Sequence, residues 1–270
     1  MKTKSFLSIP VIVVILIVVW LYMRKHAVDE HIHDYAQIEA DGVLRIVTDY
    51  NSVGYFVSGD TIAGFNHDLI QLLKSYIPFK TDIQLEASLE KSIEDLEQGK
   101  YDIVARNIPI TSALRDSINF TEPVAQNRQV LIQRKKEYND GVNPIRSHLD
   151  LAKKTLYVPF KSPVILRIQN LSHEIGDTIY VKEDPTYGPE QLAMMVASKD
   201  IDFAVCDEKA AANVAKTLSE IDYSTFIGFT HLEAWAVRKD SPALLDSLNV
   251  YIKRMKETKA YDAIYKKYYK

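Results

Sequence analysis

The sequence contains a single cysteine, Cys206, among its 270 residues. One cysteine excludes an internal disulfide and any metal site built from several cysteines. The chain also has little excess of either charge: its formal net charge is −3, and the lack of a basic stripe argues against a nucleic-acid partner. Three catalytic motifs are missing, namely G-x-S-x-G, the P-loop and H-E-x-x-H. These absences predict a protein that is not an enzyme and that needs no cofactor.

Long hydrophobic runs are also scarce, and the one that is present lies at the N-terminus. Residues 6–23 carry no charge, with Lys2 and Lys4 before them and Arg24-Lys25 after them. The run is long enough to cross the hydrocarbon core of a bilayer. No small-residue cleavage site and no cysteine follow it, so we expect an uncleaved transmembrane anchor over residues 1–25, with a cleaved signal peptide as the alternative. Basic residues at both ends leave the orientation undecided.

Residues 26–41 are polar and irregular, and we expect them to be a linker. Three histidines in this segment, His26, His31 and His33, are candidate metal ligands because imidazole commonly binds metals. Their spacing to carboxylates matches no metal motif. A solvated stalk is therefore favoured over a metal site.

The rest of the chain has an ordinary globular composition, with 47% hydrophobic and 26% charged residues overall. Short apolar segments at 44–48, 83–85 and 101–105 are typical of strands, and amphipathic segments at 64–76 and 89–98 are typical of helices. This alternation of strands and helices predicts an α/β fold.

The stretch at 96–123 contains the first candidate binding surface. The expected strand at 101–105 is followed by a polar loop at 106–111, and Thr111 is a suitable N-cap for a helix after it. In open α/β sheets, ligands bind at the carboxyl ends of strands and against helix N-termini. Arg106, Asn107 and Thr111 are therefore candidate ligand contacts.

Several motifs in the chain resemble those of the family 3 periplasmic solute-binding proteins, the receptors of amino-acid-binding type. The stretch at 96–123 carries L-x-x-G-K-x-D, I-T-x-x-x-R and F-T-x-P. The segments GFNHDL at 64–69, DFAVCD at 202–207 and WAVRKDSP at 235–242 occur in the family's order, and the tyrosine-rich end at 261–269 follows them. The resemblance covers residues 42–270. It extends in particular to the non-catalytic, receptor-like module of membrane-bound lytic transglycosylase F.

This resemblance implies a two-lobed clamshell of the type II periplasmic-binding-protein fold, with the N-terminal transmembrane helix before it. The expected division of the chain is an anchor at 1–25, a linker at 26–41, lobe 1 at 42–134 and 229–270, and lobe 2 at 135–228.

The chain departs from the amino-acid receptors at the clamp that holds the ligand's α-carboxylate. Relatives use a hydroxyl and an arginine at the positions that are Pro109 and Leu114 here. An arginine suits this task because its planar fork pairs with both carboxylate oxygens. Arg115 comes one residue late and so points about 100° round a helix, and Arg106 is the other substitute. The missing clamp weakens the expectation of a free amino acid as ligand.

Four further residues are candidates. Tyr55 and Phe56 could stack on a ligand or fill the core. Ser162 should be the N-cap of a helix. The N-terminus of that helix could face the cleft and bind an anionic group, or Ser162 could serve only as the cap. Asp207 matches the family aspartate that pairs with the ligand's ammonium group, although it could also serve as an N-cap. The complete set of predicted ligand-binding residues, which includes no metal ligand, is Tyr55, Phe56, Arg106, Asn107, Thr111, Arg115, Ser162 and Asp207.

The resemblance implies a single-pass protein of the inner membrane whose body lies in the periplasm and closes on a small solute. Two roles remain open. One is the capture of an amino-acid-like or peptide-like ligand for an ABC permease. The other is a regulatory sensor of cell-wall fragments (muropeptides) that works with a cell-wall enzyme. The membrane anchor and the disrupted clamp favour the sensor.

Overall fold

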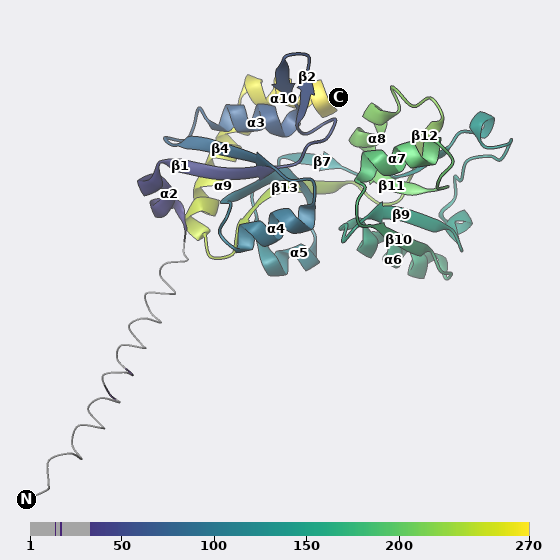
Figure 1. Cartoon of the computed structure of the whole chain (residues 1–270), viewed down its shortest axis with the longest axis horizontal. Helices are drawn as coiled ribbons and strands as arrows, with labels where there is room; N and C mark the ends of the chain where they lie inside the picture. Colours follow the sequence, from purple (N-terminus) through teal and green to yellow (C-terminus); the bar gives the residue numbers. More distant parts are fainter. Residues whose placement is uncertain (1–13, 15–16, 18–32, 270) are drawn as a thin grey trace, which may run out of the picture.

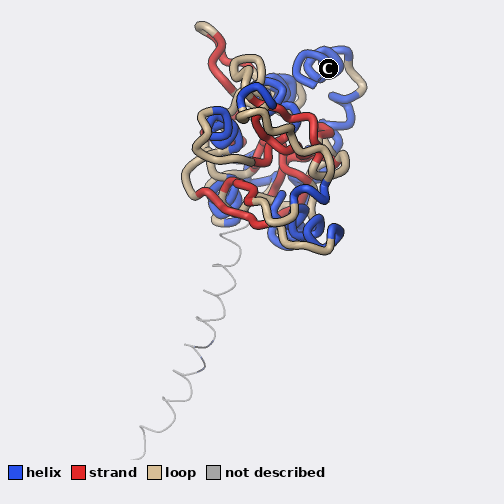
Figure 2. Tube along the Cα trace, turned by 90° about the vertical axis from the view of Figure 1, so that its right-hand side faces the viewer, coloured by secondary structure: helices blue, strands red, loops and turns tan. Residues whose placement is uncertain are grey.

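The computed structural model describes residues 33–269 together with Val14 and Ile17. These residues form two α/β lobes that lie side by side (Figure 1). Seen from the side of the second lobe, the strands gather in the middle and the helices lie mainly on the outside (Figure 2). Most of the predicted anchor falls outside the described residues. Within them, no helix combines the length and the apolar character needed to cross a membrane.

Lobe 1 is built around a mixed sheet with the strand order β4-β1-β5-β13-β6, and β7 also pairs with β13. Strands β1, β4 and β5 are parallel, whereas β13 is antiparallel to β5. The elements of this lobe are α2 (Tyr35–Asp41), β1 (Val43–Thr48), β2 (Phe56–Ser58), β3 (Thr61–Ala63), α3 (Phe65–Leu73), β4 (Lys80–Leu85), α4 (Leu89–Glu97), β5 (Ile103–Pro109), α5 (Ser112–Ser117), β6 (Ile118–Phe120), β7 (Ala125–Asn127), β13 (His231–Arg238), α9 (Pro242–Lys256) and α10 (Lys259–Tyr269).

Helices cover both faces of this sheet, and β1 accordingly buries residues on both of its faces. Successive side chains of a strand point to opposite faces. Ile46 of β1 therefore joins the core beneath α3, α9 and α10, with Phe65 and Trp235. Val47, the next residue, joins the core beneath α4, with Leu96.

Lobe 2 has a five-stranded sheet with the order β10-β9-β11-β8-β12. Val205 packs on the α6 side of this sheet and Cys206 on the α7 and α8 side, so the cysteine is a core residue as predicted. The elements of this lobe are β8 (Gln129–Arg134), the 3-10 helices η1 (Lys136–Tyr138) and η2 (His148–Leu151), β9 (Thr155–Pro159), α6 (Val164–Ile175), β10 (Tyr180–Asp184), α7 (Pro189–Ala197), β11 (Ala204–Asp207), α8 (Glu208–Val214) and β12 (Ile221–Phe226).

The first crossing between the lobes lies earlier than predicted. Lobe 1 was expected to run to residue 134, but β8 pairs with β11 and β12 inside the second sheet. The chain therefore crosses at Arg128, between β7 and β8. The Arg128 guanidinium stacks on Phe226, 3.6 Å from the ring centroid, and donates to both carboxylate oxygens of Glu208. The return crossing lies between β12 and β13, which agrees with the expected lobe boundary between residues 228 and 229.

Strand β5 is longer than the apolar pattern indicated. The predicted loop at 106–111 is mostly strand, because β13 pairs with β5 as far as Pro109 and Ile108 is buried against it. Arg106 and Asn107 are thus strand residues. Thr111 caps α5 as predicted, since its Oγ1 accepts a hydrogen bond from the Leu114 amide at 3.3 Å.

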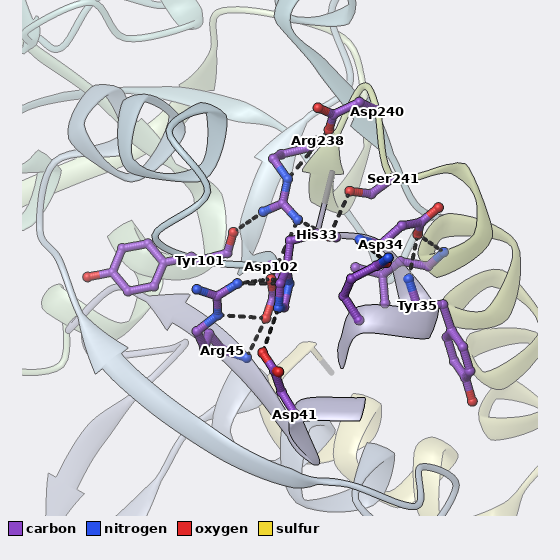
Figure 3. Close-up of polar contacts among 12 residues, drawn as sticks. His33, Asp34, Tyr35, Asp41, Arg45, Tyr101, Asp102, Arg238, Asp240 and Ser241 are labelled. Carbon is purple, nitrogen blue, oxygen red and sulfur yellow. Dashed lines mark hydrogen bonds and ion pairs between the residues drawn. The ribbon is translucent and has the colours of Figure 1, made fainter. Parts of the chain in front are cut away.

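The predicted linker is also partly wrong, because residues 34–41 form a capped helix packed on lobe 1. Asp34 caps α2 in a capping box. His33, expected in a solvated stalk, lies with Nδ1 2.9 Å from Asp102 Oδ1 and Nε2 2.9 Å from Asp41 Oδ2 (Figure 3). Arg238 donates to the His33 carbonyl. His26 and His31 lie outside the described residues.

Replacing Gly64 with alanine should lower the free energy of unfolding by about 2–3 kcal/mol. Gly64 has φ +132° at the start of α3, and a Cβ there would lie 2.3 Å from the carbonyl oxygen of Gly54. Urea unfolding measures the change. Gly59→Ala is the matched control: φ is +61° but a Cβ meets nothing within 4 Å, so it should cost about 1 kcal/mol. Equal losses in the two variants would contradict the backbone clash.

Candidate functional site

A cavity of about 400 Å³ lies between the two lobes. Lobe 1 lines it with residues at the carboxyl ends of β1 and β5, and lobe 2 lines it with the N-terminal ends of α6 and α7 and with the end of β11. A second opening of about 610 Å³ adjoins it on the α10 side and shares Tyr50, Glu190 and Tyr269 with it. The volume and position fit a small ligand held between two domains.

Five of the predicted ligand-binding residues line these openings. Arg106, Asn107, Ser162 and Asp207 line the central cavity, and Phe56 lines the adjoining one. Two of them have different local roles from those expected. The first helical turn after Ser162 is capped by Pro163 without a side-chain hydrogen bond, so Ser162 is not the N-cap. Asp207 holds the N-cap position of α8 but accepts from Gln129 Nε2 at 2.5 Å instead of from the helix.

The other three predicted residues are not part of the lining described for either opening. Tyr55 is buried, and its ring lies edge-on to the His67 ring with the centroids 5.4 Å apart. Of the two expected roles of Tyr55, the structure therefore fits core filling. Thr111 faces its own helix as a cap. Arg115 lies over the Phe120 ring at 5.7 Å. The one-residue offset turns this arginine away from the cleft, so the expectation that it replaces the carboxylate clamp is wrong.

Arg106 reaches the cavity, but its charge is already paired. Its guanidinium lies 3.2 Å from Asp49 Oδ2 and donates to the Ala87 carbonyl. Among residues 33–269, Asp49 Oδ1 and Asn107 Oδ1 are buried without a hydrogen-bond partner. Buried polar atoms are normally hydrogen-bonded. These two acceptors at the cavity wall therefore suit a ligand that brings hydrogen-bond donors.

Asp207 and Glu233 line the floor of the cavity, and His231, which is not among the lining residues, lies next to them. One ligand-type atom of each lies within 4.8 Å of the others. Asp207 comes from lobe 2, whereas His231 and Glu233 are two apart on β13 and so point to the same side of that strand. Glu233 is fully buried; it accepts from Asn127 Nδ2 at 3.3 Å and from the Tyr269 hydroxyl at 3.2 Å.

Only Asp207 of these floor residues was predicted from the sequence. The H-x-E pattern at 231–233 was the available signal for the other two. Tyr269 belongs to the tyrosine-rich end of the chain, and its ring lies against Phe65. Its hydroxyl nevertheless reaches the cavity, where it contacts Glu233 and accepts from Asn107.

The charges on the floor perturb one another. Burial, with the negative charge of Glu233 adding to it, raises the pKa of Asp207 to about 7, while His231 and Gln129 oppose the rise. Burial lowers the pKa of His231, but Glu233 and Asp207 outweigh it and leave that pKa raised. Burial and the same two carboxylates raise the pKa of Tyr269 well above its usual value. The two carboxylates thus favour a positive charge beside them, which is why the pKa of His231 is raised.

Direct hydrogen bonds join the lobes beside the cavity. The Ser52 amide and hydroxyl donate to Glu190 Oε1 at 2.9 and 2.5 Å, and Asn213 Nδ2 donates to the Ser52 carbonyl at 3.0 Å. Lys161 of lobe 2 pairs with Glu90 of lobe 1. These contacts hold the lobes against each other, so a ligand in the cavity would touch both.

Comparison with known proteins gives one family match over most of the chain. A family model described as bacterial extracellular solute-binding proteins, family 3, matches residues 44–270. Among curated proteins, the membrane-bound lytic murein transglycosylase F of Desulfosudis oleivorans is 25% identical over 235 residues, which are 86% of this chain and 50% of the relative. The protein of the same name from Pseudomonas fluorescens is 20% identical over 258 residues, which are 94% of this chain and 51% of the relative. The chain spans about half the length of these relatives.

Solved structures show the same fold. An ancestral arginine-binding protein bound to arginine superposes with a TM-score of 0.71 at 24% identity, covering 85% of this chain and 99% of that one. The substrate-binding protein of an amino acid ABC transporter superposes with a TM-score of 0.72 at 22% identity, and the match covers 84% of this chain and 99% of that one. At such identities the likeness shows the fold alone, and it confirms the predicted two-lobed type II periplasmic-binding-protein architecture.

Proposed function

Because the chain belongs to the bacterial extracellular solute-binding proteins of family 3, we propose that it captures a small amino-acid-like or peptide-like solute between its lobes, without chemical turnover. The observation that carries this proposal is the cavity of about 400 Å³, lined by polar side chains of both lobes. Hinge closure around such a cavity is a common way to bind a small ligand.

The chemistry of the lining narrows the kind of solute. The floor has two carboxylates that favour a positive charge, and the wall offers unpartnered acceptors, Asp49 Oδ1 and Asn107 Oδ1. A solute with an amino group would place donors there. An arginine clamp for a free carboxylate is lacking, since Leu114 occupies its position and Arg106 is paired with Asp49. The solute's carboxylate must therefore be absent, masked as in a peptide bond, or held by another group.

Two partners fit this role. Structural relatives named as parts of amino acid ABC transporters support delivery to a permease. The lytic transglycosylase relatives support a second candidate, a membrane-tethered sensor of cell-wall peptides that regulates a cell-wall enzyme. We favour the sensor, because the run at 6–23 would tether the body outside the cytoplasmic membrane and because the carboxylate clamp of free-amino-acid receptors is missing.

Asp207→Asn should abolish ligand-induced stabilisation of the full-length protein. The assay is thermal unfolding with amino acids, dipeptides and muropeptides, since a ligand at 100 times its Kd stabilises the folded state by about 2.7 kcal/mol. Asp207 lines the cavity, so its neutral variant should lose the shift. Asp150→Asn, at an exposed position of lobe 2, is the control and should keep it.

The identity of the stabilising solute separates the two roles. A shift with free amino acids supports transport, and a shift with muropeptides alone supports the sensor. If no compound on the panel shifts the wild-type transition, or if Asp207→Asn responds like wild type, the cavity is not the binding site and the proposal fails.

A further inference from the structure

The group of Asp207, His231 and Glu233 at the cavity floor has the composition of a transition-metal site. It offers one imidazole nitrogen and two carboxylates, and His231 Nε2 lies 3.8 Å from Glu233 Oε1. Around a tetrahedral Zn²⁺ with bonds of 2.0–2.2 Å, neighbouring ligand atoms are roughly 3.3–3.5 Å apart. The separations here, all within 4.8 Å, need only side-chain adjustments to reach that geometry.

The histidine supplies an independent sign of a missing partner. His231 Nε2 is buried and has no hydrogen-bond partner among the described residues. A nitrogen that is buried and faces two carboxylates can be satisfied by a bound cation.

The carboxylates are held by outer partners. Asn127 and Tyr269 each donate to one oxygen of Glu233, and Gln129 donates to one oxygen of Asp207. Hydrogen bonds of this kind orient metal-binding carboxylates. The imidazole distinguishes this set from a calcium or magnesium site, where oxygen ligands prevail. It also distinguishes it from a simple ammonium pocket, to which a nitrogen donor adds little.

We propose that Asp207, His231 and Glu233 bind a first-row divalent ion such as Zn²⁺, which takes the solute's carboxylate in place of the missing arginine. The second half of this inference rests on the proposed solute-binding function. Three protein ligands leave a zinc ion an open position for a further ligand. Because Asp207 belongs to lobe 2 and the other two residues to β13 of lobe 1, the ion would also join the lobes across the floor and relieve the repulsion between the two carboxylates.

Calorimetric titration of Zn²⁺ into the metal-free, full-length protein, with no solute present, tests the site. One zinc ion per chain should bind, and His231→Gln should weaken its affinity at least about 100-fold. His173→Gln, at an exposed histidine of α6, is the control and should bind as wild type. Glu233→Gln keeps a side chain that can hydrogen-bond Asn127 and should also lose zinc. No zinc binding by the wild type, or unchanged binding by folded His231→Gln, overturns the proposal.

Repeating the solute panel with and without EDTA separates this inference from the proposed function. A carboxylate-bearing solute should stabilise the zinc-loaded protein at least about tenfold more effectively than the EDTA-treated protein, judged by apparent affinity. Equal stabilisation in EDTA would overturn the metal's role while leaving the solute-binding function in place. Zinc binding without stabilisation by any solute would contradict both the solute-binding function and the binding of a solute carboxylate by the metal. Only the metal site itself would then remain.

Discussion

Replacing Asp102 with alanine should lower the free energy of unfolding by about 3–5 kcal/mol, because the change leaves the buried guanidinium of Arg238 and the partly buried guanidinium of Arg45 without this carboxylate. The Asp102 side chain is fully buried. It accepts from the Arg45 amide at 2.8 Å and from the Arg45 guanidinium at 2.9 and 3.2 Å (Figure 3). Arg238 lies 3.5 Å from it and His33 Nδ1 2.9 Å from it. Urea unfolding followed by circular dichroism measures the loss.

The same cluster provides its own control. Asp41 also contacts His33, but its side chain is 62% exposed and it makes this one ion pair. Exposed ion pairs contribute about 1 kcal/mol or less, so Asp41→Asn should change little. A loss below about 1 kcal/mol for Asp102→Ala would show that Arg45 and Arg238 find water or other partners. The N-terminal segment at 33–41 would then be held to lobe 1 chiefly by the packing of α2.

Trp235→Ala should cost about 3–5 kcal/mol of unfolding free energy. The side chain is fully buried in the core beneath α3, α9 and α10, and removing it leaves a large cavity that the sheet cannot close. Because Trp20 and Trp235 are the two tryptophans of the chain, circular dichroism is the better probe: fluorescence would lose its lobe 1 reporter in the variant.

Trp235→Phe separates the volume of the ring from its hydrogen bond. The indole Nε1 donates to Asn66 Oδ1 at 3.1 Å, and Asn66 is buried beside the cavity. Phenylalanine keeps most of the packing but leaves that oxygen unpaired, which costs about 1–3 kcal/mol. The Phe variant should therefore unfold between wild type and the Ala variant. A loss near zero for the Phe variant would mean that the Asn66 hydrogen bond contributes little, and a loss as large as that of alanine would mean that phenylalanine restores none of the packing.

The sequence alone determined the α/β class, the family and several cavity residues. Strand and helix patterns are set by side-chain periodicity within about ten residues, so the strand at β1 and the helix at α4 were predicted closely. Arg106 and Asn107 were found because they follow the apolar part of a predicted strand, and Asp207 because it ends a family motif. Thr111 was predicted as a cap because capping depends on residues three positions apart.

Tertiary structure alone decided which residues far apart in the chain become partners. The apolar sequence of Gln129–Arg134 would suit a strand in either sheet. Only its pairing with β11 and β12 assigns it to lobe 2. Glu233 meets Asn127 from 106 residues away, and Ser52 meets Glu190 from 138 residues away. Such contacts depend on how whole elements are placed by packing, which local patterns do not encode. The floor of Asp207, His231 and Glu233 exists for that reason: two lobes bring together charges that look ordinary along the chain.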